Sequence, residues 1–245
     1  MLSRALTEMF RRRLVAASFA FRGGTALHKL HFDPPGRYSE DIDLVQIDAG
    51  PIGPALDDLR AALDPWLGEP SSRRSADSVK LVYRFETTAL PVQPMRLKVE
   101  INTREHFSCR GLREHEFTVE TLWYTGDAKV TTYALEELLG TKLRALYQRK
   151  KGRDLYDLWR ALTDLDVDAE AVVACFRSYM ERGSTTVTRA LFEANLAEKL
   201  VSRVFRGDVI PLLRTGEAYD VDQAGALVLE RLVARLPGDP WKGRI

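Results

Sequence analysis

Two aspartates separated by one residue are the first side chains in this sequence that could do chemistry together. Asp41 and Asp43 lie in residues 41–47, where the alternation of side chains is typical of a β-strand. Side chains two apart on a strand share a face, about 6.6 Å apart along the backbone. Two carboxylates so placed repel each other unless a cation lies between them, and hard oxygen ligands suit Mg²⁺. The spacing therefore predicts a magnesium site that could support phosphoryl transfer.

The alternative is a strand edge with two solvated acids, because Asp-x-Asp alone is a weak motif. An upstream turn favours the metal site. Gly23, Gly24 and Thr25 lie between an expected strand over residues 18–21 and an expected short helix over residues 25–30. Small residues let backbone N–H groups approach a phosphate, and a helix N-terminus favours its negative charge. A lone Gly-Gly-Thr is also a common tight turn, but in this order it predicts nucleotide binding by all three residues.

These two blocks resemble a known family. Arg22-Gly-Gly-Thr-Ala-Leu27, followed by Arg37-Tyr-Ser-Glu-Asp-Ile-Asp-Leu44, closely resembles the DNA polymerase β-type nucleotidyltransferases, and more specifically the AbiEii/MenT group of toxin–antitoxin toxins. The resemblance covers residues 10–165. It implies an α+β fold with a polymerase β-like nucleotidyltransferase lobe built on a small mixed sheet, followed by a helical C-terminal lobe. It also implies dependence on Mg²⁺ and a nucleoside triphosphate as donor.

The resemblance also implies a function. Several similar proteins transfer pyrimidine nucleotides to the 3′ end of tRNA and so halt translation, which makes CTP or UTP the favoured donor, tRNA the favoured RNA and a cognate antitoxin the expected partner.

A second hypothesis is a small-molecule nucleotidyltransferase of the antibiotic-modifying kind, using the same metals. A third is a non-enzymatic binding protein on a decayed scaffold, which intact Asp41, Asp43, Lys142 and Asp154 disfavour. The sequence reveals neither the nucleotide nor the acceptor.

A third carboxylate is usual in this superfamily, on a neighbouring strand. Residues 97–102 alternate cleanly, with Lys98 and Glu100 on the polar face. Glu100 is therefore expected to join Asp41 and Asp43, either as a metal ligand or as the base that deprotonates an RNA hydroxyl. The alternative is an exposed strand face. Lys98 is then expected to be the surface partner of Glu100.

A basic helix is the second candidate feature. Residues 135–150 carry an apolar stripe at helical spacing, and six basic residues lie in and just after this segment. Such a run is usually a solvated face, but Lys142 lies close to the apolar stripe and could supply a triphosphate with a compact counter-charge. The resemblance implies the same role for Lys142 and makes Asp154 an active-site acid, with Arg153 and Asp157 as weaker candidates. The alternative for Asp154 is a helix N-cap.

Two residues just before the aspartate pair complete the candidate site. In the family that this sequence resembles, a hydroxyl at the position of Ser39 contacts phosphate, and in some members an antitoxin kinase modifies it. The alternative is a loop serine that caps a turn. Arg37 is expected to steer triphosphate or RNA. His28 and His31 lie three apart on the short helix but lack the further ligands that zinc requires.

The elements that position these residues follow from periodicity and turn chemistry. A composition shift near residues 125–134 predicts a boundary between an α/β lobe over residues 1–130 and a helical lobe over residues 131–245 that contributes to the active site and binds acceptor RNA. Trp123 is expected in a core. The expected elements are a helix over 3–17, strands over 41–47, 79–85, 95–102 and 116–122, a helix over 54–67, a polar loop over 68–77, and helices over 135–150, 153–163, 168–181, 188–204 and 217–235.

Composition limits the kinds of partner and cellular compartment that fit this sequence. The 245 residues carry a net charge of +1, so binding to nucleic acid must come from a local basic patch. Two distant cysteines do not make a disulfide framework, and a reducing cytoplasm is the simpler expectation. Basic residues 11–13 before the apolar run 14–21 loosely resemble a signal peptide, but cleavage there would remove the element leading into Gly23. No stretch reaches the roughly 18 apolar residues of a membrane helix, so no membrane partner is expected.

Overall fold

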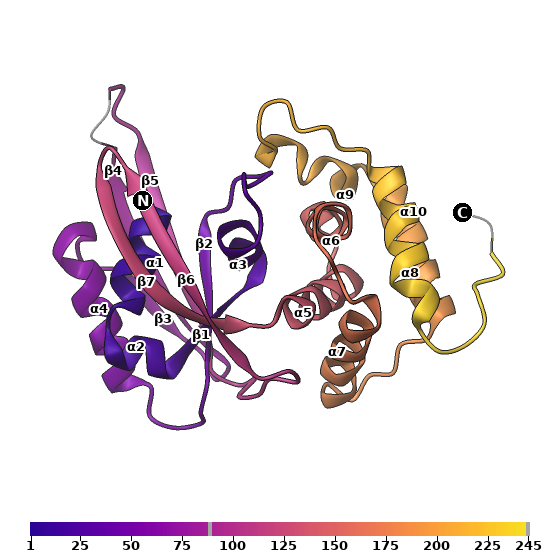
Figure 1. Cartoon of the computed structure of the whole chain (residues 1–245), viewed down its shortest axis with the longest axis horizontal. Helices are drawn as coiled ribbons and strands as arrows, with labels where there is room; N and C mark the ends of the chain where they lie inside the picture. Colours follow the sequence, from indigo (N-terminus) through magenta and orange to yellow (C-terminus); the bar gives the residue numbers. More distant parts are fainter. Residues whose placement is uncertain (88–89, 244–245) are drawn as a thin grey trace. The chain divides into compact units, whose positions relative to one another are not determined.

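The computed structural model describes residues 1–87 and 90–243. These residues form two compact units, and the chain passes between them three times. Unit 1 comprises Met1–Asp33 and Ser39–Tyr133, and unit 2 comprises Pro34–Tyr38 and Ala134–Ile245. The two units are strand-rich and helical respectively, which confirms the α+β class predicted from the sequence (Figure 1).

Unit 1 is built on a mixed sheet with strand order β3-β4-β5-β2-β1-β7-β6. The pairs β2–β5 and β1–β7 are parallel, and the remaining neighbours are antiparallel. The central position of β1 and β2 follows from their many buried apolar side chains. The described strands are β1 (Phe19–Arg22), β2 (Asp41–Gln46), β3 (Ser71–Arg74), β4 (Ser78–Glu86), β5 (Pro94–Asn102), β6 (Leu112–Thr121) and β7 (Tyr124–Tyr133).

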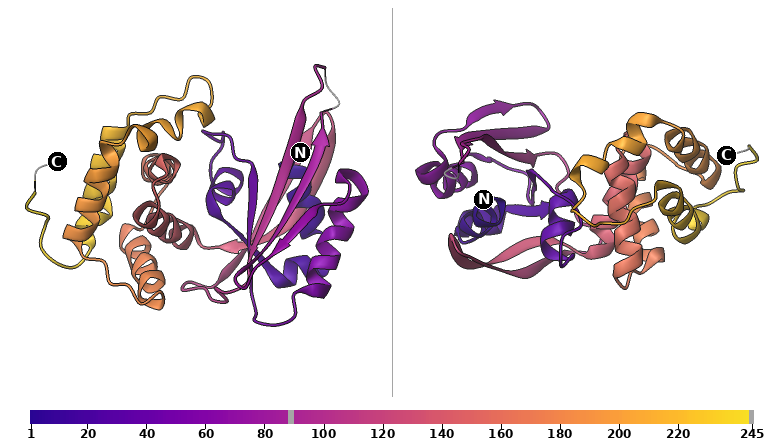
Figure 2. Two further views of the ribbon diagram at one scale, coloured as in Figure 1. Left: turned by 180° about the vertical axis from the view of Figure 1, so that it is seen from behind. Right: turned by 90° about the horizontal axis from the view of Figure 1, so that it is seen from above.

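Helices cover the sheet of unit 1 unequally. The inner face packs on α1 (Leu2–Phe10), α2 (Arg13–Ser18) and α4 (Gly53–Leu67), with α1 against β6 and β7 and α4 against β4. Figure 2 shows α1 between the β4–β5 and β6–β7 sides of the curved sheet. The helix α3 (Gly23–Leu30) lies on the other side of β1 and β2 (Figure 1). We call that side the outer face.

Two expectations for unit 1 are wrong in detail. The helix predicted over residues 3–17 is broken into α1 and α2, because Arg12 adopts an extended conformation and its guanidinium pairs with Asp58 at 2.6 Å. The polar loop predicted over residues 68–77 contains β3. Its exposed side chains give no buried face to detect, and its backbone pairing with β4 makes it a strand.

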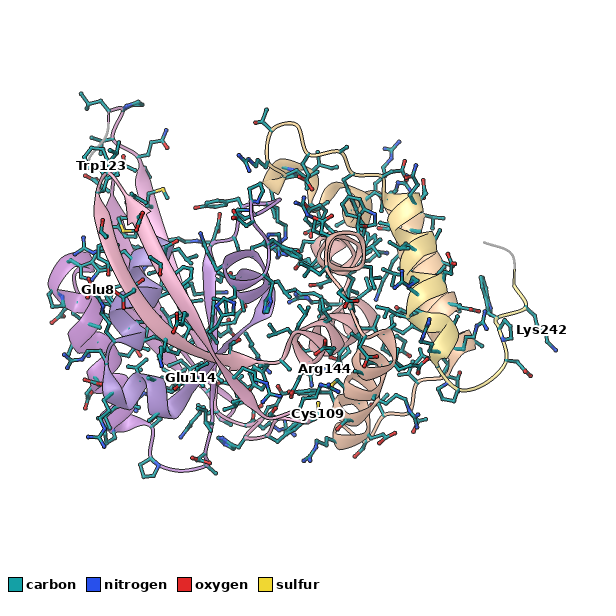
Figure 3. All side chains as sticks on the ribbon, in the orientation of Figure 1. Glu8, Cys109, Glu114, Trp123, Arg144 and Lys242 are labelled. Carbon is teal, nitrogen blue, oxygen red and sulfur yellow. The ribbon has the colours of Figure 1, made fainter. Side chains whose placement is uncertain are left out.

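The predicted lobe boundary near residues 125–134 falls on a strand. Residues 125–133 lie in β7, which pairs along its whole length with β6 and carries alternating buried side chains. The chain passes into unit 2 after Tyr133. Their polar composition reflects burial on one face only. Trp123, expected in a core, lies at the turn between the two strands and is 89% exposed (Figure 3).

Unit 2 is helical. The helix α5 packs against α6 and α7, and α6 packs against α10. The segment Pro34–Tyr38 joins this unit through a bridge between Arg37 and Leu213, with the Tyr38 amide donating to the Leu212 carbonyl at 2.7 Å. The helix predicted over residues 188–204 ends early and is followed by a short one. The described helices are α5 (Leu135–Gln148), α6 (Gly152–Asp164), α7 (Ala169–Arg182), α8 (Arg189–Leu200), α9 (Arg203–Gly207) and α10 (Val221–Arg231), with 3₁₀ turns η1 (Ile210–Leu212) and η2 (Val233–Arg235).

Candidate active-site residues in two units

The paired aspartates lie on β2 in unit 1, as the alternation predicts. Asp41 and Asp43 are partly exposed on the outer face, whereas Ile42 between them is buried. In the parallel register of β2 and β5, Asp43 lies opposite Glu100. The three acids that the sequence singled out therefore occupy one face of two adjacent strands.

Gly23 begins α3 directly beside this pair. Its φ of +82° belongs to the left-handed region, which favours glycine. A Cβ at this position would also collide with the carboxylate oxygen Oδ2 of Asp43 and lie 3.1 Å from its Cγ. The carboxylate of Asp43 thus packs against the first residue of a helix, where the aligned peptide dipoles stabilise negative charge. Any side chain here would displace Asp43.

Two hydroxyl groups tie α3 to the start of β2. Thr25, which is buried, donates from Oγ1 to the carbonyl of Asp41 at 2.5 Å. Ser39 Oγ lies 2.5 Å from the same Thr25 oxygen. Because Thr25 has one hydroxyl proton, Ser39 is the donor in this second hydrogen bond. Thr25 lies within the first turn of α3 rather than capping it, since the N-cap residue is Arg22. Thr25 and Ser39 therefore hold the backbone that carries Asp41.

A lysine lies among the three acids. Lys98 Nζ is 2.8 Å from Asp41 Oδ2 and 3.3 Å from Glu100 Oε2, and Lys80 Nζ is 2.8 Å from Glu100 Oε1. Burial alone would lower the pKa of Lys98, but its hydrogen bond to Asp41 and the nearby charges raise it overall. Lys98 therefore neutralises Asp41 as well as Glu100. The sequence predicted only the second contact.

Glu100 is held by two ammonium groups. Although burial acts to raise the pKa of Glu100, its pairing with Lys80 and Lys98 lowers it below its ordinary value. A carboxylate with a lowered pKa is a weaker proton acceptor at neutral pH. Of the two roles that the sequence left open for Glu100, these ion pairs disfavour the general base.

The acids of unit 1 suit a divalent cation that is only partly coordinated by protein. In the described part of the chain, no group of three or more His, Cys, Asp or Glu side chains is arranged to hold a metal ion. Mg²⁺, however, typically takes one or two carboxylates and completes its shell with water and substrate phosphate. Asp41, with 38% of its side chain exposed, and Asp43 on the same face supply such a pair. The donor set fits a cation that arrives with its nucleotide.

A second set of charges is buried within unit 2. Lys142 on α5 is 6% exposed, and its Nζ lies 3.1 Å from Asp154 Oδ1 and 3.0 Å from Asp157 Oδ2. Both carboxylates, which lie one helical turn apart on α6, are 0% exposed. The spacing of three residues places the two acids on one side of α6, where they hold one lysine between them.

Two arginines complete this cluster: Arg37, which is buried, and Arg149, whose side chain is 53% exposed. Arg37 donates from Nε and Nη2 to the two oxygens of Asp157, both at 2.7 Å. Arg149 makes the same two-point contact with Asp154, at 2.6 and 2.7 Å. Burial would raise the pKa of Asp154, but Lys142 and Arg149 lower it overall. Burial would likewise lower the pKa of Arg37, and Asp157 raises it overall. Three cations against two carboxylates leave the cluster with one excess positive charge.

Asp154 is not a helix N-cap. The N-cap residue of α6 is Lys151, and Asp208 accepts a hydrogen bond from the backbone amide of Arg153 at 3.2 Å. Another acid therefore serves the start of α6, which leaves both oxygens of Asp154 for Lys142 and Arg149. The structure thus separates the two readings of Asp154 that the sequence left open.

Sequence reasoning undervalued three residues. Lys98 was visible on the alternating face of β5, but its reach to Asp41 depends on the pairing of two distant strands. Arg149 was one of six basic residues, with no signal to distinguish it. The sequence favours Asp154 over Asp157, yet Asp157 binds both Lys142 and Arg37.

Comparison with known proteins identifies the family of this chain. The family described as nucleotidyl transferase AbiEii toxin, Type IV TA system, matches residues 4–226. The chain belongs to the AbiEii family. This confirms the resemblance found in the sequence, and it makes the protein a nucleotidyltransferase toxin of a toxin–antitoxin system. The family implies a nucleotide substrate and a cognate antitoxin.

Solved structures share the fold of this AbiEii-family chain. The nucleotidyltransferase toxin MenT4 of Mycobacterium tuberculosis is 19% identical, with a TM-score of 0.69 over 96% of this chain and 82% of MenT4. JHP933 of Helicobacter pylori is 16% identical, with a TM-score of 0.57 over 95% of this chain and 88% of that one. A nucleotidyltransferase-like structure from H. pylori is also 16% identical, with a TM-score of 0.54 over 95% and 91% of the two chains. At these identities the likeness shows the fold.

The sequence matches none of the curated proteins compared with it. Among the helices in residues 1–87 and 90–243, none has the length and apolar character needed to span a membrane.

Proposed function

We propose that this AbiEii-family toxin uses Mg²⁺ to transfer a nucleotide from CTP or UTP to RNA in the cytoplasm. The favoured acceptor is the 3′ end of tRNA, whose modification would block translation. The observation that carries the proposal is the partly exposed pair Asp41 and Asp43, held against the glycine turn that begins α3. The choice of donor and acceptor rests on the sequence resemblance.

In unit 1, the proposed roles follow from the local geometry. Asp41 and Asp43 would hold the cation, which when bound neutralises phosphate oxygens and polarises the reacting phosphoryl group. The backbone N–H groups of Gly23 and Gly24 would bind the triphosphate, as a helix N-terminus does. Thr25 would keep Asp41 in place through its carbonyl.

Ser39 and Glu100 would assist these residues in unit 1. Ser39 donates its hydroxyl proton to Thr25 in this structure. Its proposed contact with the nucleotide requires that the hydroxyl rotate, so that a phosphate oxygen replaces Thr25 as the acceptor. Glu100 would anchor Lys80 and Lys98 and so set the charge beside Asp41.

In unit 2, the resemblance implies that Lys142 is a triphosphate contact, and we keep that role as a proposal. Because Asp154 and Asp157 hold its ammonium in this structure, the role requires that a phosphate oxygen replace one of these carboxylates. Arg37 was expected to contact nucleotide or RNA directly, but its guanidinium is engaged by Asp157. We therefore assign Arg37 a positioning role through that carboxylate.

Labelled nucleotides test the proposal. Purified protein would be incubated with Mg²⁺ and each α-labelled NTP in turn, with total RNA, purified tRNA, or a panel of small amines and alcohols as acceptors. Label is expected on tRNA from a pyrimidine nucleotide, and Asp41→Asn should abolish it. Label on a small molecule alone would instead identify an antibiotic-modifying type of enzyme. No transfer to any acceptor by the wild type, under conditions where it binds NTP, would contradict the proposal.

A further inference from the structure

The outer face of β3, β4 and β5 carries a row of basic side chains. Residues that pair across antiparallel strands share a face, and the register pairs Arg73 with Lys80 and Arg84 with Arg96. Lys98, two residues from Arg96, lies on the same face. This is also the face that carries Asp41, because Lys98 lies opposite Asp41 in the β2–β5 register and contacts its carboxylate.

Burial confirms the assignment of faces. Along β4, Val79, Leu81 and Tyr83 are buried, while the residues between them are partly or fully exposed. The side chain of Arg96 is 68% exposed and that of Lys80 is 42% exposed. The basic row therefore faces solvent. The opposite face of the same strands carries the apolar side chains that form the core of unit 1.

The outermost arginines are weakly neutralised. Lys80 and Lys98 are both engaged by Glu100, as described above. Arg84 donates to the uncharged hydroxyl of Ser71 at 3.0 Å. Arg96 meets Glu40 at 3.5 Å, in a pair whose side chains are both exposed. Exposed pairs of this kind contribute little and exchange partners readily. We call Arg73, Arg84 and Arg96 the arginine face.

The other end of the same face has the opposite charge. On β6 and β7 the outward positions hold Glu114, Glu116, Glu120 and Asp127, with Lys129 opposite Glu116. Along β3, β4 and β5 the outward cations Arg73, Lys80, Arg84, Arg96 and Lys98 outnumber the outward acids Glu86 and Glu100. The outer face is therefore net basic on that side of β2 and net acidic on the other. A polyanion that reaches Asp41 and Asp43 is attracted along β3, β4 and β5 and repelled along β6 and β7.

The extent of the arginine face indicates a polymer. β3 lies three strand spacings from β2, which is about 14 Å. The row extends over three adjacent strands, so it presents several cationic side chains in succession, as binding to a polyanion requires. Arginine on an open surface is well suited to bind successive phosphates of a nucleic acid backbone without reading its sequence.

We propose that the arginine face binds the phosphodiester backbone of the acceptor RNA and directs its 3′ end toward Asp41 and Asp43. The inference rests on the proposed function, since it presumes an RNA acceptor. It places RNA contacts in unit 1, whereas the sequence analysis predicted that the helical lobe binds the acceptor RNA. An acidic protein such as an antitoxin is the competing occupant, and continuity with the acid pair that performs the transfer favours RNA.

The test measures the affinity for fluorescently labelled total tRNA by anisotropy, with Mg²⁺, without NTP, and across a range of salt concentrations. The test variant is Arg73→Gln/Arg84→Gln/Arg96→Gln. A matched control removes three exposed positive charges of unit 1 elsewhere: Arg74→Gln/Arg113→Gln/Lys129→Gln. Arg74 is the most informative of these, because it neighbours Arg73 on the edge strand but points to the opposite face.

The triple variant of the arginine face is expected to bind tRNA at least about tenfold more weakly near 0.1 M salt, with a salt slope lower by about three. The control should stay within about twofold of wild type, because its charges lie off the proposed path. Arg96→Gln alone should lower the slope by about one. This single exposed substitution keeps the test valid if the triple variant is unstable in thermal unfolding.

Equal losses in the test and control variants, or none in either, would overturn the inference. So would displacement of tRNA by poly-glutamate at an equal concentration of charge, which would assign the face to acidic proteins. These outcomes are distinct from failure of the proposed function. If wild type labels RNA while the arginine-face variant binds tRNA normally, only the inference fails. If wild type neither binds nor labels RNA, both fail.

Discussion

Each unit of this protein holds a pair of aspartates beside a lysine, and the two pairs differ in burial. Asp41 and Asp43 are partly exposed on a strand, where Lys98 contacts one of them. Asp154 and Asp157 are fully buried on a helix and are saturated by one lysine and two arginines. An exposed ion pair contributes roughly 0–1 kcal/mol and can exchange its partner, whereas breaking a buried pair leaves an uncompensated charge. The same residue types are therefore suited to chemistry in unit 1 and to fixing a lysine in unit 2.

The largest expected effect follows from removing an exposed acid. Asp41→Asn should lower nucleotide transfer by about 10³-fold or more, because a metal ion contributes several kcal/mol of charge stabilisation in such reactions. The same change should leave the unfolding free energy within about 1 kcal/mol of wild type, since it breaks an exposed pair. Initial rates of label transfer and urea unfolding measure the two quantities. A large loss of stability would erase the contrast between the two pairs.

Removing a buried acid should show the reverse pattern in stability. Asp157→Ala leaves Arg37 and Lys142 without a shared partner inside unit 2, and we expect a loss of about 3–5 kcal/mol in unfolding free energy. Chemical denaturation measures it, with Asp41→Ala as the exposed control. If both substitutions cost the same, burial does not distinguish the two pairs.

A smaller effect should appear in metal affinity. Lys98 and a divalent cation compete for Asp41, so Lys98→Met should tighten Mn²⁺ binding by about fivefold, the equivalent of an exposed ion pair worth about 1 kcal/mol. Lys80→Met is the matched control, because Lys80 contacts Glu100. Electron paramagnetic resonance of free Mn²⁺ measures the affinity without any turnover. Weaker binding by the Lys98 variant would show that Lys98 orients Asp41 instead of competing for it.

The last expected effect concerns the pH dependence of stability. Lys199 is buried, donates to the Tyr147 carbonyl at 2.7 Å, and has its pKa lowered by burial from 10.5 to about 8. The folded state therefore binds this proton less tightly than the unfolded chain does. This difference in proton binding makes the free energy of unfolding increase with pH. The gain is complete above pH 10.5 and is lost as the pH falls through about 8.

Wild type should accordingly gain stability relative to Lys199→Met as the pH rises from 8 toward 10.5. Urea unfolding at several pH values measures the difference in unfolding free energy between the two proteins. Groups that titrate alike in both proteins do not contribute to this difference. A difference that is constant with pH would mean that burial does not affect this lysine.

Local pattern determined much of the fold and of the acid pair. The alternation in residues 41–47 follows from strand geometry, so it correctly placed Asp41 and Asp43 on one face before any tertiary contact was known. Helical periodicity likewise identified α5, α6 and α7 almost to the residue. The edge strand β3 could not be predicted in this way, because its identity comes from pairing with β4 and its side chains have no buried side.

The sequence by itself predicted which residues carry the chemistry, and its motifs identified the family. Only the tertiary structure decided what each charge touches. Arg37 binds Asp157, which lies 120 residues away in the sequence. Lys98 contacts Asp41 because their two strands pair in parallel. Arg149 binds Asp154 rather than another acid of the chain. Periodicity is set by the backbone geometry of a few neighbouring residues. Ion pairs between distant segments depend instead on how those segments pack, which no local pattern records.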